Sequence, residues 1–173
     1  APSHLDEKGK LEHAKWLFDV KLRAIENCRK ADMRSVVLVP VIVKGMNDHQ
    51  LGDIINFAIK NIDVVRCVNF QPVSFAGRTE KWEVQNGRIT IPEALHKIEE
   101  QTNCLIKTED FYPVPCVVPI SEFLNEYKMK KHVEFTVHPH CGAATYLYVE
   151  KGKATPITQL ANVDSFFNAL SIA

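Results

Sequence analysis

Two apolar runs joined by an amphipathic segment, all within residues 35–78, constrain the fold of this chain more than any other feature. The first run, Val36–Val43, is rich in Val and Ile and is interrupted only by Pro40, so it predicts a buried strand with an irregularity at the proline. The second run, Val64–Phe70, predicts another strand. Between them, apolar residues recur at helical spacing over Leu51–Ile62. A helix that connects two strands predicts a parallel pair with a crossover, which is almost always right-handed.

The loop after the first predicted strand carries a helix-start signal. Asn47 is a favourable N-cap residue, and Gln50 three residues later completes a capping-box pattern. The sequence therefore predicts that Asn47 caps the crossover helix. Helix capping accounts for Asn47 and Asp48 as readily as a binding role does, so both interpretations stay open.

Polar side chains gather where the two predicted strands end. In parallel α/β folds, the carboxyl ends of the strands form the edge at which ligands bind. The polar residues at this edge are Lys44, Asn47, Asp48, Asn69, Gln71, Ser74 and Arg78. Asn69 and Gln71 are strong candidates, because two amides on a strand end beside a proline need partners if they are buried.

Composition removes several classes of protein. The chain has 173 residues, with 21 lysines and arginines against 21 aspartates and glutamates, so no positive field argues for a nucleic-acid partner. No apolar run approaches the roughly 18–20 residues that span a bilayer. Five cysteines without regular spacing predict a reducing compartment, where clustered thiols more often bind metal or react than form disulfides. We therefore expect a cytoplasmic protein, and peripheral membrane contact stays open.

A helix is expected before the first strand, over residues 11–31. Its apolar residues fall close to one face and its charges on the other, as expected of a helix packed on a sheet. The order is then helix, strand, helix, strand, which is the alternation of an α/β fold.

After residue 80 the pattern becomes more irregular, and proline-rich loops separate short elements. The elements predicted there are a helix over 92–102 with a Thr90–Glu93 capping box, strands over 133–137 and 144–149, a short helix capped by Ser121 and a terminal helix capped by Asp164. The length favours one domain with an appendage, and the change of pattern falls between residues 1–80 and 81–173.

Cys116 and Cys141 are the pair of residues that most strongly suggests chemistry. Cys116 lies in Pro-Val-Pro-Cys and Cys141 in His-Pro-His-Cys-Gly, and such proline-stiffened loops can present a thiolate to a metal. A lone loop cysteine is more often a small hydrophobic residue, so for the pair the metal-binding and structural interpretations are equally open. His138 and His140 could add nitrogen ligands, but only one of them would face the same site.

The remaining cysteines are interpreted differently. Cys28 lies on a predicted apolar helix face and Cys67 in a predicted strand, so both are expected to be buried in the core. Cys104 is left undecided. No Cys-x-x-Cys, Gly-x-Gly-x-x-Gly or Gly-x-x-x-x-Gly-Lys-Ser/Thr motif occurs, which removes zinc-ribbon, Rossmann and P-loop interpretations.

Several segments together resemble radical S-adenosylmethionine (radical SAM) enzymes. The segments that carry the resemblance are AIENCRKADM, LVPVIVKGMNDHQLGDIINFAI, VRCVNFQPVSFAGR, FYPVPC and HPHCGAATYLYV. They fall within residues 11–149 and look like the archaeal tetraether lipid synthase and dihydropterin methyltransferase-like subgroup, which is related to proteins of molybdenum-cofactor synthesis. The resemblance implies an α/β fold, with the C-terminal part of a partial (β/α) radical SAM barrel over 1–80 and a small α+β cysteine-containing lobe over 81–173.

In that family a [4Fe-4S] cluster, held by a Cys-x-x-x-Cys-x-x-Cys loop, cleaves S-adenosylmethionine to a 5′-deoxyadenosyl radical. This loop is absent from the sequence. We therefore expect the chain to be the C-terminal half of a longer protein, to need the N-terminal half as its partner and to be inactive alone. By the same resemblance, Cys116 and Cys141 are candidate ligands of an auxiliary iron–sulfur cluster. The residues expected to face S-adenosylmethionine or the substrate are Asn47, Asn69, Gln71 and Ser74.

The resemblance leaves two reactions open: carbon–carbon bond formation between lipid chains in tetraether lipid synthesis, and methyl transfer to a pterin. Two acyl chains need a long apolar tunnel, whereas a pterin needs a flat slot with amide or carboxylate partners. A hypothesis from another class is a non-catalytic α/β binding or assembly module with structural cysteines. Such a module would hold no iron and would keep its stability if Cys116 and Cys141 were both replaced by alanine.

Overall fold

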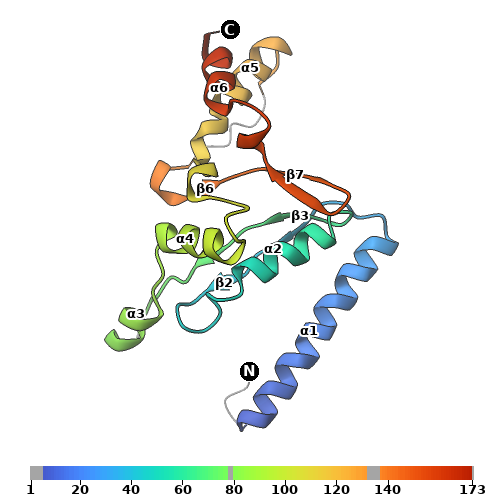
Figure 1. Cartoon of the computed structure of the whole chain (residues 1–173), viewed down its shortest axis with the longest axis vertical. Helices are drawn as coiled ribbons and strands as arrows, with labels where there is room; N and C mark the ends of the chain where they lie inside the picture. The colour runs from blue at the N-terminus through green and yellow to red at the C-terminus, as the bar shows by residue number, and fades with distance from the viewer. Residues whose placement is uncertain (1–5, 78–79, 132–136, 173) are drawn as a thin grey trace.

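The computed structural model of the protein describes residues 6–77, 80–131 and 137–172 (Figure 1). The helices are α1 (Glu7–Lys30), α2 (Leu51–Lys60), α3 (Lys81–Gly87), α4 (Ile91–Gln101), α5 (Val118–Tyr127) and α6 (Val163–Ile172), with short 3₁₀ helices η1 (Thr108–Asp110), η2 (Val114–Val117), η3 (Pro139–Cys141) and η4 (Ile157–Gln159). The strands are β1 (Val36–Leu38), β2 (Val41–Ile42), β3 (Val65–Val68), β4 (Gln71–Pro72), β5 (Tyr112–Pro113), β6 (Ala143–Ala144), β7 (Leu147–Glu150) and β8 (Lys153–Pro156). This mixture agrees with the predicted α/β class. The described strands form two-stranded sheets and not a closed barrel.

The predicted strand–helix–strand unit is present, and its strands are parallel. β1 pairs with β3 and β2 with β4, so that Val41 lies opposite Gln71. Each predicted strand is divided into two short pieces. The division in the first falls at Pro40, whose nitrogen carries no hydrogen to donate to a neighbouring strand. Hydrogen bonds still join the two parallel segments across the division. The Asn69 N–H donates to the Leu38 carbonyl at 2.8 Å, and the Gln71 N–H donates to the Pro40 carbonyl at 3.0 Å.

The predicted start of the crossover helix is wrong. Helix α2 begins at Leu51, and the residue before it, Gln50, makes no side-chain cap. The Asn47 amide is engaged elsewhere, because its Oδ1 accepts the Val43 N–H at 2.8 Å and its Nδ2 donates to the Val41 carbonyl at 2.8 Å. Both ends of the amide bind the backbone around the end of β2, so neither is left to cap the helix. Asn47 therefore fixes the following loop to β2.

Helices α2 and α4 pack against each other beside the parallel strands (Figure 1). Ile42 on β2 and Leu51 on α2 are fully enclosed, with 0% exposure. The largest buried cluster consists of Ile42, Leu51, Ile55, Ile89, Ala94, Ile98 and Ile106. One core thus combines residues from both sides of residue 80, and the division into 1–80 and 81–173 stays a prediction.

Helices α2 and α4 approach each other closely at Gly52. Its N–H donates to Gln101 Oε1 at 3.1 Å, and Gln101 Nε2 donates to the Asp48 carbonyl at 2.8 Å. A Cβ atom at position 52 would lie 2.6 Å from the Gln101 carbonyl oxygen. The contact therefore requires glycine, and the Gln101 side chain closes the gap between α4 and the loop before α2.

Helix α1 confirms the predicted helix over 11–31 but not its predicted packing. Asp6 caps it by accepting the Gly9 N–H at 2.7 Å. Its apolar face is open among the described residues, with Leu17 38%, Phe18 57% and Leu22 37% exposed. Figure 1 shows the helix extending away from the rest of the fold. In the largest buried cluster the helical residues come from α2 and α4, and none come from α1.

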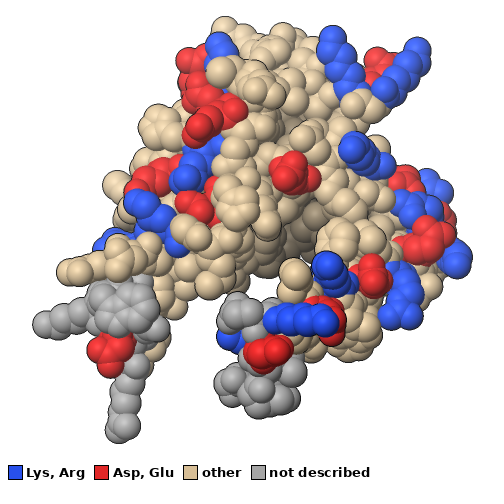
Figure 2. All heavy atoms as spheres, turned by 60° about the horizontal axis from the view of Figure 1, so that its bottom comes forward, with Lys and Arg blue, Asp and Glu red and all other residues tan. Residues whose placement is uncertain are grey.

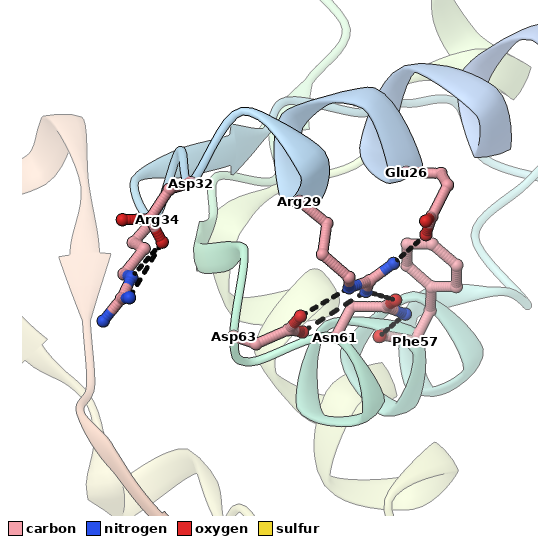
Figure 3. A network of polar contacts seen from close by, with 7 residues as sticks. All are labelled: Glu26, Arg29, Asp32, Arg34, Phe57, Asn61 and Asp63. Atoms are coloured by element: carbon pink, nitrogen blue, oxygen red, sulfur yellow. Dashed lines mark hydrogen bonds and ion pairs between the residues drawn. The ribbon is translucent and has the colours of Figure 1, made fainter.

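Arg29 attaches the C-terminal end of α1 to the loop between α2 and β3 (Figure 3). Its Nε donates to Asp63 Oδ2 at 2.5 Å and its Nη2 donates to Asn61 Oδ1 at 2.9 Å, while Glu26 on α1 forms a further ion pair with it. These groups are largely exposed, so salt screens them. The network therefore determines where α1 is attached, and it adds little to the stability of the fold.

The local signals after residue 80 are confirmed in part. Helix α4 has the predicted capping box, with reciprocal bonds between Thr90 and Glu93. The terminal helix is capped by Asn162, whose Oδ1 accepts the Ser165 N–H at 2.9 Å, so the predicted cap at Asp164 is wrong. The cap predicted at Ser121 is also wrong. Helix α5 already begins at Val118, where Pro119 occupies the first turn.

The described strands of the second half are shorter and more divided than predicted. β7 and β8 form an antiparallel hairpin, and Lys151 and Gly152 make its turn with positive φ values. The strand predicted over 133–137 lies outside the described residues, apart from Val137, and the one predicted over 144–149 is divided between β6 and β7. β6 pairs with β5 instead of continuing into the hairpin. This pairing between distant segments has no signature in local periodicity.

The surface carries both signs of charge side by side. On the face shown in Figure 2, lysine and arginine side chains are interspersed with aspartates and glutamates. This agrees with the equal numbers of acidic and basic residues in the sequence. None of the described helices combines the length and the apolar character that a membrane-crossing helix needs.

Replacing Gly52 with alanine is expected to lower the free energy of unfolding by about 1–3 kcal/mol, because the new methyl group collides with the backbone of Gln101. The better helix propensity of alanine offsets part of this loss. Asn56→Ala, at an exposed position of α2, is the control and is expected to change stability by less than about 0.5 kcal/mol. Chemical denaturation measures both variants, and equal unfolding energies would contradict the close approach.

Candidate functional site

The parallel strands β1–β4 have two faces, and one of them is open among the described residues. Along a strand, alternate side chains point to the same face, and the opposite face carries Ile42 into the core with α2 and α4. The residues on the open sheet face are Val37, Val39, Val41, Cys67, Asn69 and Gln71. The three valines are each about half exposed, at 48%, 50% and 49%. The open sheet face therefore places a row of apolar side chains beside a row of thiol and amide groups.

Cys67 lies on the open sheet face, and the prediction that it is a core residue is wrong. It is exposed and pairs across the strands with Val37. The apolar run predicted burial on both faces, as in a parallel sheet covered on both sides. Only one face is covered here. Cys28 on α1 is partly buried.

The predicted polar residues at the strand ends have different surroundings. Asn69, Gln71 and Ser74 are exposed, so their side chains are open to a ligand. Asn47 is half-buried and its amide is bonded to the backbone. Arg78 lies outside the described residues. The structure thus brings Asn69 and Gln71 to the open sheet face and gives Asn47 a supporting position behind its edge.

Asp48 anchors the turn at this edge. It is 6% exposed, and its carboxylate pairs with Lys97 Nζ on α4 at 3.0 Å and accepts the Gly45 N–H at 2.9 Å. The Lys97 ammonium, followed by the Gly45 N–H, holds the pKa of Asp48 below its ordinary value. Gly45 has a φ of 74°, a backbone conformation that glycine adopts without strain. Asp48 therefore stays ionised and ties the turn to α4.

Lys44 makes a second, more exposed link between this loop and α4. Its Nζ lies 2.9 Å from Glu93 Oε1. The Lys44 ammonium, together with hydrogen bonds from Thr90, lowers the pKa of Glu93 to about 2. Lys44 and Asp48 are therefore engaged in positioning the loop.

The second half of the chain brings the two predicted cysteine loops together. β5 pairs antiparallel with β6, and the Val114 N–H donates to the Gly142 carbonyl at 3.2 Å. Cys116 in η2 and Cys141 in η3 therefore lie in contacting segments. Cys141 is exposed, whereas Cys116 is partly buried, and this burial raises the pKa of its thiol.

The donor set around the cysteine loops is small. The rings of His138 and His140 lie tilted to each other with their centres 5.1 Å apart, and His138 Nδ1 accepts the His140 N–H at 3.3 Å. Within the part of the chain that the structure describes, no group of three or more His, Cys, Asp or Glu side chains could hold a metal ion. Cys104 is exposed just after α4. The described residues thus supply two thiols on contacting segments, which do not complete a four-thiolate cluster site.

A polar pocket of about 450 Å³, here called the α6 pocket, lies between β5 and the start of α6. Burial, followed by the neighbouring Asp164 carboxylate, raises the pKa of the Tyr112 hydroxyl, and the charge of Cys116 contributes as well. The pocket therefore adjoins the cysteine loops. The lining side chains that can hydrogen-bond are Tyr112, Thr158, Gln159, Asn162 and Asp164.

Sequence reasoning missed the α6 pocket. Its one local signal is the pair Asn162 and Asp164 at a helix start, of which the sequence analysis considered only Asp164, as a cap. Tyr112, which completes the pocket, is far away in the sequence. The pocket therefore depends on packing that periodicity does not reveal.

Comparison with known proteins finds similarity to a methyltransferase. No family model matches the chain. Over 151 residues the chain is 48% identical to a Methanocaldococcus jannaschii protein named 7,8-dihydro-6-hydroxymethylpterin dimethyltransferase. The match covers 87% of this chain and 30% of that relative, so the chain spans less than a third of the relative's length. The similarity is therefore strong over one segment of a longer methyltransferase.

Asp48→Asn is expected to lower the free energy of unfolding at neutral pH by about 1–3 kcal/mol, because the amide keeps an acceptor for Gly45 but loses the ion pair with Lys97. The native pKa of Asp48 is depressed, so its contribution is complete above the ordinary aspartate pKa of about 3.9 and is lost as the pH falls through the native value.

The difference between wild type and Asp48→Asn should therefore shrink on acidification. Asp53→Asn, an exposed site on α2, serves as the control for the chemical change alone. Denaturant titrations from neutral pH to below the ordinary aspartate pKa measure the difference in unfolding free energy between the two proteins. A difference that grew as the pH fell would show that the carboxylate does not stabilise the native state.

Proposed function

We propose that this chain forms part of a radical S-adenosylmethionine enzyme that transfers methyl groups to a pterin. The observation that carries the proposal is the 48% identity, over 87% of the chain, to a protein named as a dihydropterin dimethyltransferase. Of the two reactions that the sequence left open, the name of this relative favours the pterin over lipid chains. The parallel strands with one open face support the proposal, because such a face can receive a cofactor.

In this proposal the open sheet face receives S-adenosylmethionine. The cofactor combines a flat apolar ring system with polar ribose and amino-acid groups, and the face combines half-exposed valines with amides. Asn69 and Gln71 would hydrogen-bond the polar groups, and Ser74 would extend the contact beyond the strand end. Asn47 would act indirectly, because its amide holds the loop that borders the face.

A [4Fe-4S] cluster is the second proposed cofactor, and when bound it supplies the electron that cleaves S-adenosylmethionine. No Cys-x-x-x-Cys-x-x-Cys loop occurs in the sequence, so the radical cluster would be held by another segment and this chain alone would be inactive. Cys116 and Cys141 would provide two thiolates for an auxiliary cluster. Since the described residues do not complete that site, its other ligands would come from elsewhere.

The incomplete donor set also favours one other candidate, a non-catalytic binding or assembly module. In that case Cys116 and Cys141 would only pack the contact between η2 and η3. All five cysteines are free thiols, which suits the reducing cytoplasm in which we place the protein. Activity and iron content therefore have to separate the two candidates.

The proposal predicts that this chain can replace the matching segment of the Methanocaldococcus jannaschii relative. Such a chimera, prepared without oxygen, is expected to methylate 7,8-dihydro-6-hydroxymethylpterin, with the product measured by mass spectrometry. The relative lacking that segment is the negative control. If the chimera melts cooperatively and yields no methylated pterin, the non-catalytic module becomes the better interpretation.

Iron content tests the two cysteines separately from activity. In the chimera, Cys116→Ala combined with Cys141→Ala is expected to remove about four iron atoms, the content of one [4Fe-4S] cluster, because a cluster loses its thiolate ligands. Cys28→Ala, at a partly buried site on α1, is the matched control and should leave the iron content unchanged. The same iron and sulfide content in the double variant would rule out this auxiliary cluster.

A further inference from the structure

The α6 pocket contains a carboxylate that is not neutralised by a basic side chain of its own lining. Asp164 lies against the Tyr112 hydroxyl, and the lining includes no lysine or arginine. A second cavity among the described residues, of about 270 Å³, differs in this respect. There Asp63 is bound by Arg29 at 2.5 Å and Asp32 by Arg34 at 2.8 Å. Unlike Asp63 and Asp32, Asp164 has no arginine in its pocket lining, so its oxygens can accept hydrogen bonds from a neutral ligand.

Amide groups accompany this carboxylate. The Oδ1 of Asn162 accepts the Ser165 N–H at 2.9 Å, which leaves its NH₂ group as a donor to the pocket. Gln159 contributes a second, exposed amide. The hydroxyl of Thr158 donates to the buried carboxylate of Asp110, so this side chain fixes the pocket wall. The α6 pocket thus offers a carboxylate acceptor beside amide donors.

This donor and acceptor pattern matches one edge of a pterin. That edge carries an amino group and a ring N–H next to each other, followed by a carbonyl oxygen. A carboxylate can accept both N–H groups with its two oxygens, and an amide NH₂ can donate to the carbonyl. A cavity of about 450 Å³ is within the range of small-molecule sites and has room for the two fused rings.

We propose that the α6 pocket binds the pterin ring, with Asp164 accepting its amino and ring N–H groups and Asn162 or Gln159 donating to its carbonyl. This inference rests on the proposed function, which supplies the substrate class, while the choice of pocket comes from the side chains described above. The Tyr112 ring packs 6.4 Å from that of Phe167, centre to centre, and forms an aromatic wall of the site.

The position of the pocket fits a substrate site in the second half of the chain. β5, which carries Tyr112, runs directly into η2, which carries Cys116. A pterin bound against Tyr112 therefore lies beside the cysteine loops. The pocket is built by β5, η4 and α6, so its residues are separate from those of the open sheet face, which is assigned to S-adenosylmethionine.

Calorimetric titration of the full chain tests the assignment with two ligands. These are 7,8-dihydro-6-hydroxymethylpterin and its analogue in which a carbonyl replaces the amino group, a lumazine. Wild type is expected to prefer the pterin by about tenfold or more, because the lumazine carbonyl faces the carboxylate instead of donating to it. Asp164→Asn should weaken pterin binding by about tenfold or more and abolish the preference.

Asp164→Glu should keep the preference for the pterin, because it retains the carboxylate. Asp53→Asn is the matched control, since it makes the same change in the first turn of α2, and it should bind the pterin like wild type. The wild-type comparison of the two ligands needs no variant. Equal binding of pterin and lumazine therefore overturns the inference even if Asp164→Asn does not fold.

The outcomes separate this inference from the proposed function. If the chimera methylates the pterin but wild type does not bind it, or binds pterin and lumazine equally, the assignment to the α6 pocket is overturned and the proposed function stands. Unchanged pterin binding by a folded Asp164→Asn variant overturns it as well. If the chain binds no pterin and the chimera methylates none, both proposals fall.

Discussion

The contact between Gly52 and Gln101 is the constraint on which the arrangement of the candidate site depends. Because Gly52 has no side chain, α4 comes close enough for one amide to bond both α2 and the loop before it. The same approach brings Lys97 to Asp48 and Glu93 to Lys44. A helix from beyond residue 80 thus holds the loop that borders the open sheet face. Weakening the helix contact would therefore change the edge of the site without touching any residue on it.

The second half of the chain depends on an equally small set of long-range contacts. The pairing of β5 with β6 brings Cys116 and Cys141 into contacting segments, and it places Tyr112 at the α6 pocket. Asp110 holds another part of the pocket wall, since its buried carboxylate accepts the Lys107 N–H at 2.7 Å and the hydroxyl of the lining residue Thr158. The cysteine loops and the pocket thus share one short strand, and a change in its register would move both.

Sequence patterns predicted what depends on neighbouring residues and missed what depends on packing. Apolar periodicity gave the parallel unit, and the Thr90–Glu93 capping box was confirmed because both partners lie within one helical turn. Asn47 was misassigned because the strand backbone just before it competes with the helix for its amide. Cys67 was misassigned because burial depends on what covers the second face of a sheet. The α6 pocket was missed because its walls are distant in sequence.

Helix α1 shows how little surface ion pairs determine by themselves. The Arg29 network is exposed, so water and salt screen it, and it fixes only the point at which the helix is attached. Trp16 and Phe18 remain more than half exposed. Fully burying one large apolar side chain contributes about 1.5–3 kcal/mol, which exceeds what screened surface pairs commonly supply. Burial of either side chain would therefore bias the direction of α1 more than the ion pairs do, while Arg29 limits only where the helix is attached.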